Sequence, residues 1–325
     1  RLQKRLYVVL PFLISYFFET FPSKSSISMR IIIINQSNFI QIKFNFSVNW
    51  RQHLRPILVI FASTVVVTIY VSSDITLLGV MENDYTVGIY TVVVKLYHIV
   101  QGVLAAILTV VIPRLAWLWG KKRCLEYNSL LKQLFNGLLL LALPIVTGIT
   151  MLSRAIILLI AGQKYLAALG SLRIISWAIL FSIMAWLFSD CVLIVVKRET
   201  LILRNTVMVA LLNVGLNLVL IPLLSDQGAA ISTVIAELSA MLLNYWTCRD
   251  IVNLIILNKD TCKNIFEVLV GCMGIVIVCG LCERVSNIFI QIVLAVSISG
   301  LVYVSILLLL RNQFLFKLVK QLKKK

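Results

Sequence analysis

Several ionisable residues lie inside apolar stretches of this 325-residue sequence, and these are the places where chemistry could occur. Asp74 lies about six residues before the end of one stretch, and Lys95 lies about six residues after the start of the next. At 1.5 Å of helix per residue, both would lie roughly 9 Å below the same membrane surface and could pair across a hairpin. Glu237 and Asn217 lie at similar depths in two later stretches. Because a charge inside a bilayer costs at least about 2.5–3.5 kcal/mol, such groups usually face a cavity or one another.

Three further residues complete the candidate substrate pathway. Arg173 marks the start of another apolar stretch, Asp190 lies in its far half, and Asn213 precedes Asn217 by one helical turn. Together with the first group, they predict an outward-facing vestibule of mixed charge. The alternative is structural, with the acid and the lysine forming a static ion pair and the asparagines forming interhelical hydrogen bonds.

The elements that must position these residues are apolar stretches long enough to cross a bilayer as helices. We expect eight spans, at about 56–80, 89–113, 134–153, 173–196, 205–224, 229–248, 265–283 and 288–310. Basic residues gather in alternate connections, which are 114–133, 197–204, 249–264 and the C-terminal tail. The positive-inside rule then places both ends of the eight-span block in the cytoplasm.

The composition supports the same class. Hydrophobic residues make up 60% of the chain and charged residues 13%, whereas soluble domains have about 45–50% and about 25%. We therefore predict an all-α integral membrane protein whose main partner is the lipid bilayer. The net charge of +17 would suit a nucleic-acid partner, but its concentration in alternate loops is explained by membrane topology alone, so we predict no nucleic-acid binding.

The first fifty residues do not follow the regular pattern of spans. Leu6–Phe21 is apolar but short and contains Glu19, while Ile31–Ile34 is too brief to cross a membrane. The sequence also begins with Arg1. We expect residues 1–50 to be an irregular or truncated N-terminal segment.

The sequence offers little for metal, redox or enzymatic chemistry. Cys279 and Cys282 form a CxxC pair, but they lie in an apolar stretch, where buried thiols are the expected interpretation. The two histidines could not serve a metal cluster or a hydrolytic triad, and no glycine-rich nucleotide loop is present. We predict no metal, no cofactor, no enzymatic activity and no direct use of ATP.

Several motifs resemble a known transporter family. They are Tyr70-Val-Ser-Ser-Asp-Ile-Thr-Leu-Leu-Gly79, Val87-Gly-Ile-Tyr90, Val111-Ile-Pro-Arg114, Asn213-Val-Gly-Leu-Asn217, Leu220-Ile-Pro222 and Gly228-Ala-Ala-Ile-Ser-Thr233 followed by Glu237. In this order they resemble the C-terminal lobe of bacterial polysaccharide flippases of the multidrug/oligosaccharidyl-lipid/polysaccharide exporter superfamily. The resemblance covers about residues 50–250.

The resemblance implies an architecture. Residues 51–250 would form the six-helix C-terminal lobe of a two-lobed transporter, and 251–325 would add two transmembrane helices and a basic cytoplasmic tail. The first lobe is missing from the sequence, so we expect an incomplete chain.

The resemblance also implies a function. The whole protein would move undecaprenyl-pyrophosphate-linked oligosaccharides, such as O-antigen units of lipopolysaccharide or capsule repeats, across the bacterial inner membrane by alternating access, beside the polysaccharide polymerase machinery. Lys95 and Arg173 would meet the pyrophosphate, while Asp74, Glu237 and Asn217 would contact the sugar or couple transport to an ion.

Other functions remain open on this sequence. A multidrug/cation antiporter of the same superfamily would use Asp74 or Glu237 as its coupling-ion site. A membrane-embedded polymerase or glycosyltransferase would need catalytic residues on a large external loop, and the predicted outer loops are short. A non-functional transporter fragment is the third alternative.

Overall fold

The structure is a computed structural model that describes residues 28–35, 38–45, 50–256, 258–285 and 287–316. The chain divides into two compact units, residues 1–58 and 59–325. The first unit contains an antiparallel hairpin of strands β1 (Ser28–Asn35) and β2 (Asn38–Asn45), in which Ser28 pairs with Asn45 and Asn35 with Asn38. The first strand contains four isoleucines and the second contains isoleucine and phenylalanine, residues that favour extended backbone, so part of the segment expected to be irregular is a regular hairpin.

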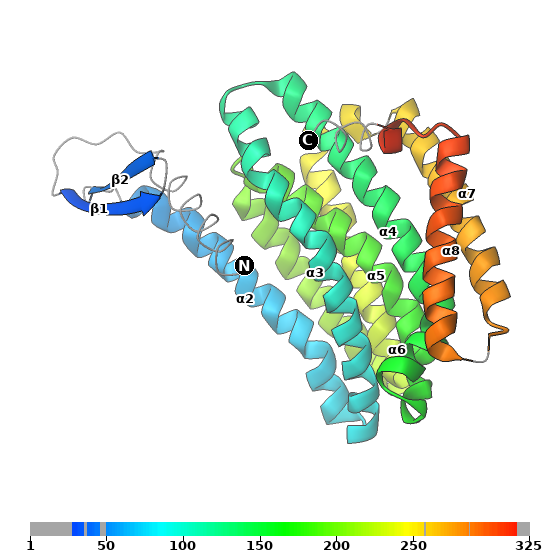
Figure 1. Ribbon diagram of the computed structural model, residues 1–325. Coiled ribbons are helices and arrows are strands. Elements are labelled where there is room, and N and C mark those ends of the chain that lie inside the picture. Colours follow the sequence, from blue (N-terminus) through cyan, green and yellow to red (C-terminus); the bar gives the residue numbers. More distant parts are fainter. Residues whose placement is uncertain (1–27, 36–37, 46–49, 257, 286, 317–325) are drawn as a thin grey trace. The chain divides into compact units, whose positions relative to one another are not determined.

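The second unit is a bundle of long helices (Figure 1). The helices are α2 (Trp50–Met81), α3 (Asp84–Gly120), α4 (Cys124–Ile160), η1 (Gln163–Ala168), α5 (Leu169–Phe188), the π-helical η2 (Ser189–Ile194), α6 (Glu199–Ile256), α7 (Lys259–Cys282) and α8 (Ile288–Leu309). Seven helical segments of the described chain are long and apolar enough to cross a membrane.

The longest segment, α6, is two helices joined by a sharp turn. Ser225 has φ 55° and ψ −130°, a conformation outside the helical region. The two halves then run back along each other, because Asn205 Nδ2 donates to Asn244 Oδ1 and to Thr247 Oγ1, each over 3.0 Å. With α6 counted as two helices, the seven candidate segments would make eight passes through a membrane, and the predicted all-α membrane class is confirmed.

Asparagine caps mark the starts of three helices. Asn83 accepts a hydrogen bond from the Thr86 amide, Asn258 from that of Asp260, and Asn287 from those of Phe289 and Ile290. An asparagine oxygen at this position satisfies amides that have no partner within the helix. These caps fix where α3, α7 and α8 begin.

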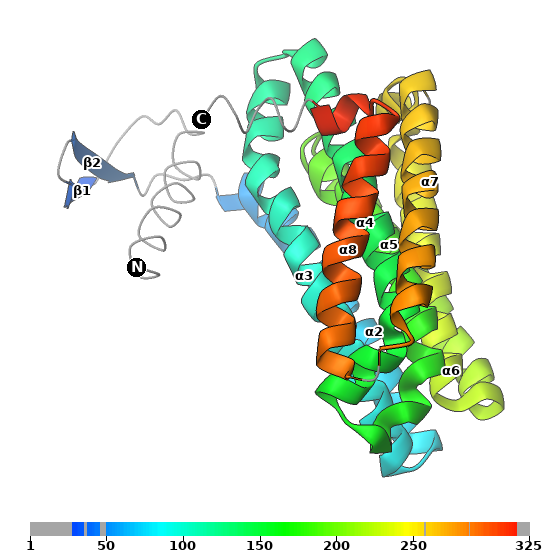
Figure 2. The same ribbon diagram turned by 45° about the vertical axis from the view of Figure 1, so that its right-hand side comes forward.

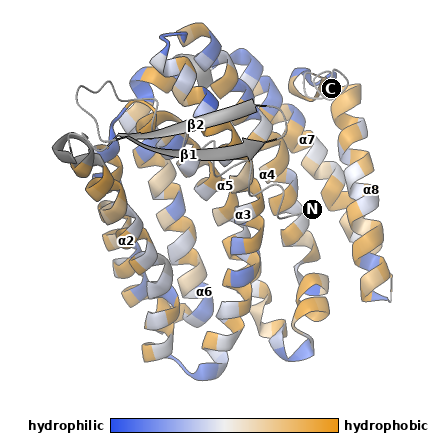
Figure 3. Ribbon diagram, turned by 60° about the vertical axis from the view of Figure 1, so that its left-hand side comes forward, coloured by the Kyte–Doolittle hydropathy of each residue, from blue (hydrophilic) through white to orange (hydrophobic). Residues whose placement is uncertain are grey.

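The helices are apolar along most of their length, with polar residues concentrated near their ends (Figure 3). Much of this apolar surface points outward, as in Val110, which is 78% exposed, and Leu211, which is 71% exposed. In a membrane protein such side chains contact lipid, so their exposure carries no penalty. The interior lies around α5, which is the most buried of the candidate spans.

The pair α7 and α8 packs beside α4 (Figure 2). Gly271 leaves room for the ring of Tyr303, whose hydroxyl donates to the Leu140 carbonyl over 2.8 Å. Near the other end, Asn264 Nδ2 donates to Asn136 Oδ1 on α4 over 2.9 Å, and Asn312 Nδ2 donates to Asn264 Oδ1 over 2.8 Å. Buried amides thus join α4, α7 and the segment after α8.

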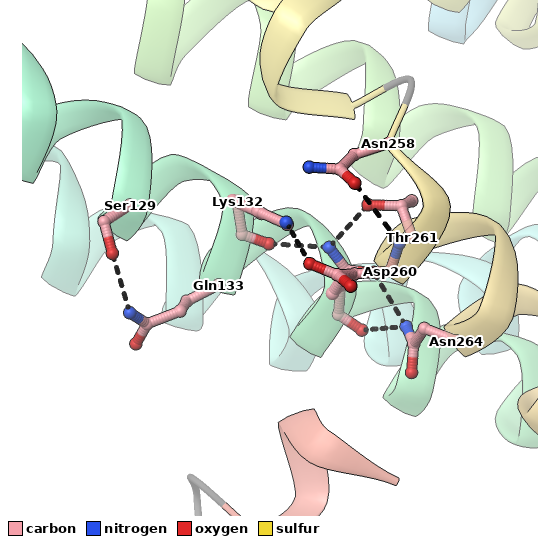
Figure 4. Close-up of polar contacts among 8 residues, drawn as sticks. Ser129, Lys132, Gln133, Asn258, Asp260, Thr261 and Asn264 are labelled. Atoms are coloured by element: carbon pink, nitrogen blue, oxygen red, sulfur yellow. Dashed lines mark hydrogen bonds and ion pairs between the residues drawn. The ribbon is translucent and has the colours of Figure 1, made fainter.

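The exposed edge of this contact is charged. Lys132 Nζ on α4 lies 2.7 Å from Asp260 Oδ2 at the start of α7 (Figure 4). The Asn136 amide nitrogen also donates to Thr261 Oγ1 over 3.2 Å. The two additional helices are therefore attached to α4 by a continuous set of polar contacts at one end and by close packing along their length.

Candidate functional site

A buried carboxyl group, that of Asp74 on α2, forms the centre of the candidate site. Asn217 Nδ2 donates to its Oδ1 over 2.6 Å, and Thr233 Oγ1 donates to its Oδ2 over 2.6 Å. The Tyr90 hydroxyl lies 3.3 Å from Oδ2 and 3.2 Å from Thr233 Oγ1. Only 5% of the Asp74 surface is exposed, so this charge-bearing group is enclosed by donors from α3 and from both halves of α6.

A second buried carboxyl group lies one layer further along the same helices. Glu237 Oε1 accepts hydrogen bonds from the Tyr70 hydroxyl over 3.2 Å and from the Tyr97 hydroxyl over 3.4 Å. Gln101 Nε2 donates to the Tyr97 hydroxyl over 2.8 Å. Glu237 is 5% exposed. Its hydrogen-bond donors are the hydroxyls of two tyrosines, whereas the donors closest to Asp74 are an asparagine amide and a threonine hydroxyl.

Helical spacing explains why the two layers form. Tyr70 and Asp74 are four residues apart on α2, as are Thr233 and Glu237 on α6, and residues four apart lie on one face of a helix. Asp74, Asn217 and Thr233 each lie about two turns from the nearest helix end or turn, so they share a depth. The helices therefore bring both acids to one face of the α2–α3–α6 contact.

Two amide atoms in the first layer are unsatisfied. Asn217 Nδ2 donates to Asn213 Oδ1 over 3.2 Å as well as to Asp74, which leaves Asn217 Oδ1 and Asn213 Nδ2 without a partner among the described residues. Both asparagines are fully buried. An unpaired buried polar group costs roughly 1–3 kcal/mol. These two amide atoms are therefore available to bind a small polar species or ion.

The predicted pairing of Asp74 with Lys95 is wrong. Lys95 is exposed, while Asp74 is buried among other partners. Tyr90, Val93 and Tyr97 form the buried face of α3, and at 100° per residue Lys95 points away from that face. Equal depth in the membrane did not bring the two charges together, because they lie at different angles around their helices.

Of the residues expected to share a vestibule with Asp74, Asn213 and Asn217 lie in its layer and Glu237 lies in the next one, but Arg173 and Asp190 are not part of this cluster. Arg173 is exposed and donates from Nε to Ser153 Oγ on α4 over 2.9 Å. Asp190 lies in the π-helix η2 and accepts a hydrogen bond from Ser189 Oγ over 2.9 Å. The two residues lie near opposite ends of α5 and η2, so no single vestibule contains them.

The sequence interpretation missed the hydroxyl donors. Tyr70, Tyr90, Tyr97 and Thr233 all contact one of the two acids. Three of these lie within the family motifs quoted above, but they were not assigned to the site. For Tyr70 and Thr233 the available signal was their spacing, because a hydroxyl or phenol four residues from an acid within a membrane span lies on the same face as that acid. Tyr90 and Tyr97 have no acid at that spacing and gave no such signal.

Comparisons with known proteins support the fold. Residues 5–119 match the family model described as "Polysaccharide biosynthesis protein", a match that includes most of the N-terminal segment set apart above. No curated protein matches the sequence significantly. Among solved structures, the chain is similar to "Lipid II flippase MurJ, inward closed conformation", with 19% identity and a TM-score of 0.66.

That alignment covers 85% of this chain and 57% of the MurJ chain, so the present sequence spans little more than half the length of that structure. The family match and the fold arise from different evidence, one from sequence and one from coordinates. Together they show that residues 5–119 are similar to polysaccharide biosynthesis proteins and that the chain shares the fold of that flippase structure.

Proposed function

We propose that this chain takes part in moving undecaprenyl-pyrophosphate-linked oligosaccharide repeat units across the bacterial inner membrane by alternating access, and that it is a transporter without enzymatic activity. The observation that carries the proposal is a flippase-like helical fold with two buried acids, Asp74 and Glu237, held between α2, α3 and α6. O-antigen or capsule repeat units are the substrates expected for this class.

In this proposal the buried acids couple transport to the movement of an ion. An isolated charge in a low-dielectric interior is costly, so a carboxylate enclosed by neutral donors needs a proton or cation to accompany it. Binding of that ion and its release on the other side of the membrane would bias the contact of α2 and α3 with α6. The unpaired oxygen of Asn217 is a further ligand for such an ion next to Asp74.

The substrate would contact the outward face of α3. Lys95 is exposed there at membrane depth, and charged residues inside a bilayer face a cavity or another protein in preference to lipid. A cationic group in that position suits a pyrophosphate. Arg173 remains a candidate contact for the same anion, at a separate place on α5.

The topology follows from the loop charges. Lys121, Lys122 and Arg123 lie between α3 and α4, and Lys197 and Arg198 lie before α6. With these loops in the cytoplasm, the C-terminus is cytoplasmic as well, and the Ser225 turn faces the outer side. The polysaccharide polymerase would then receive the flipped lipid on that outer side.

The test is transport of a fluorescent lipid-linked oligosaccharide in proteoliposomes, combined with restoration of surface polysaccharide in a flippase-null strain. Asp74→Asn keeps the size of the side chain but removes its charge and replaces one accepting oxygen with a donating amide nitrogen. We expect it to reduce ion-driven transport at least tenfold, and Lys95→Gln to reduce it through weaker substrate binding. The matched controls are Asp84→Asn and Lys164→Gln, which change exposed charges at helix ends and should transport normally.

Full transport by both Asp74→Asn and Lys95→Gln, at unchanged membrane levels, would contradict the proposal. A multidrug/cation antiporter is distinguished in the same vesicles, because it would exchange a small organic cation for the coupling ion and ignore the lipid. A polymerase or glycosyltransferase would lengthen or transfer the glycan, which mass spectrometry of the recovered lipid would show.

A further inference from the structure

His98 lies three residues after Lys95 on α3, and both side chains are exposed. Residues three apart on a helix are neighbours on its surface, so the imidazole and the ammonium share one patch. The buried face of α3, which includes Val94 and Tyr97, packs into the bundle. His98 is therefore the exposed titratable group nearest in sequence to the proposed anion contact, and the proposed function gives it no role.

A directed chain of hydrogen bonds connects His98 to the buried acid Glu237. His98 Nδ1 lies 3.1 Å from Gln101 Oε1, Gln101 Nε2 donates to the Tyr97 hydroxyl over 2.8 Å, and that hydroxyl donates to Glu237 Oε1 over 3.4 Å. The Tyr97 and His98 rings also lie 5.0 Å apart, centroid to centroid.

The chain determines which nitrogen of His98 carries the proton. The Gln101 amide nitrogen is used toward Tyr97, so the atom that faces the imidazole is an oxygen, which can only accept. Nδ1 must therefore carry a hydrogen, and in the neutral ring Nε2 is an acceptor. Nε2 has no hydrogen-bond partner within the described part of the chain.

We propose that His98 is a second contact for the anionic headgroup beside Lys95, and that it takes up one proton at Nε2 when the headgroup binds. The inference rests on the proposed function. An acceptor nitrogen repels an anion, whereas a protonated Nε2 donates a charge-assisted hydrogen bond to it. The proton comes from water, and no other bond is made or broken.

The groups around His98 fit this role. Lys95 on α3 adds positive charge to the patch, Glu237 on α6 lies at the far end of the chain, and Tyr70 on α2 shares Glu237 with Tyr97. Glu237 thus accepts a hydrogen bond from Tyr97, and Tyr97 accepts one from Gln101. The contact with Gln101 in turn fixes the orientation of the His98 ring. Because the proposed binding step takes up a proton, headgroup affinity should depend on pH.

The experiment measures binding of undecaprenyl pyrophosphate to the full chain in lipid nanodiscs between pH 6 and pH 8, with undecaprenol as the uncharged probe. Uptake of one proton predicts that affinity rises as pH falls, by up to tenfold per unit. His98→Gln retains a donor that does not titrate, and should bind with a markedly smaller pH dependence. Lys95→Gln should bind more weakly but keep the wild-type pH dependence.

The tautomer is tested separately. The chain has two histidines, so in a His53→Asn variant the ¹⁵N-histidine spectrum reports His98 alone. We expect the Nδ1–H form in the neutral ring, and its loss in Gln101→Leu. If wild type and His98→Gln have the same pH dependence, or the neutral ring carries its proton on Nε2, the inference is wrong and the proposed function stands. Absence of pyrophosphate-dependent binding at every pH would overturn both.

Discussion

The contact between Gly271 and Tyr303 makes a quantitative prediction about how α7 and α8 pack. A Cβ atom at Gly271 would lie 2.6 Å from Tyr303 Cδ2 and 2.7 Å from Cε2. The ring is not free to move aside, because its hydroxyl donates to the Leu140 carbonyl over 2.8 Å. Overpacking costs about 1–3 kcal/mol and loss of the hydrogen bond about 0.5–1.5 kcal/mol, while alanine restores about 1 kcal/mol of helix propensity.

We therefore expect Gly271→Ala to lower the free energy of unfolding by roughly 0.5–3.5 kcal/mol. Gly280→Ala on the same helix is the matched control, because nothing lies within 4 Å of its Cβ position, and it should be neutral or stabilising by up to about 1 kcal/mol. Equilibrium unfolding in mixed detergent micelles measures both variants. In a Tyr303→Leu background, most of the cost of Gly271→Ala should disappear.

The packing argument fails if Gly271→Ala and Gly280→Ala have the same stability. It also fails if the cost of Gly271→Ala is unchanged when Tyr303 is replaced, because the double-mutant cycle would then show no coupling between the two positions.

Three further predictions concern the helix contacts. Ser225→Gly should stabilise the protein by about 1 kcal/mol in the same unfolding assay, because φ 55° with ψ −130° is a conformation that glycine adopts without strain. Gly228→Ala should prevent the α6 hairpin from closing, since its Cβ would lie 2.1 Å from the Leu220 carbonyl oxygen, and this is measured as loss of folded protein in size-exclusion chromatography. Asn264→Leu should cost about 1–3 kcal/mol, because the buried amides on α4 and after α8 lose a partner; an unchanged unfolding midpoint would contradict this.

The number and order of the helices could be predicted from the sequence because each depends on a local property. Apolar stretches of sufficient length define the spans, and short polar connections separate them. Even the turn within α6 was predicted as a connection at 225–228, where the structure places the non-helical Ser225. Hydropathy changes sharply at these positions, so little tertiary information was needed.

The partners of each polar residue could not be predicted in the same way. Depth along a helix follows from residue number, but contact also requires the correct angle around the axis and the choice of neighbouring helix. Lys95 met the first condition and failed the second, because Tyr90 and Tyr97 define the buried face of α3. Asp74 instead found donors on α6, about 140 and 160 residues away in sequence.

The turn at Ser225 also has a consequence for biogenesis. Its two helices are joined with almost no intervening loop, and Asn205 bonds to Asn244 and Thr247 across them. The short connection leaves no polar segment to remain on one side of the membrane after the first helix has crossed it. We therefore expect the two helices to enter the membrane as one hairpin, with Asn213 and Asn217 crossing the apolar region together with Thr233 and Glu237.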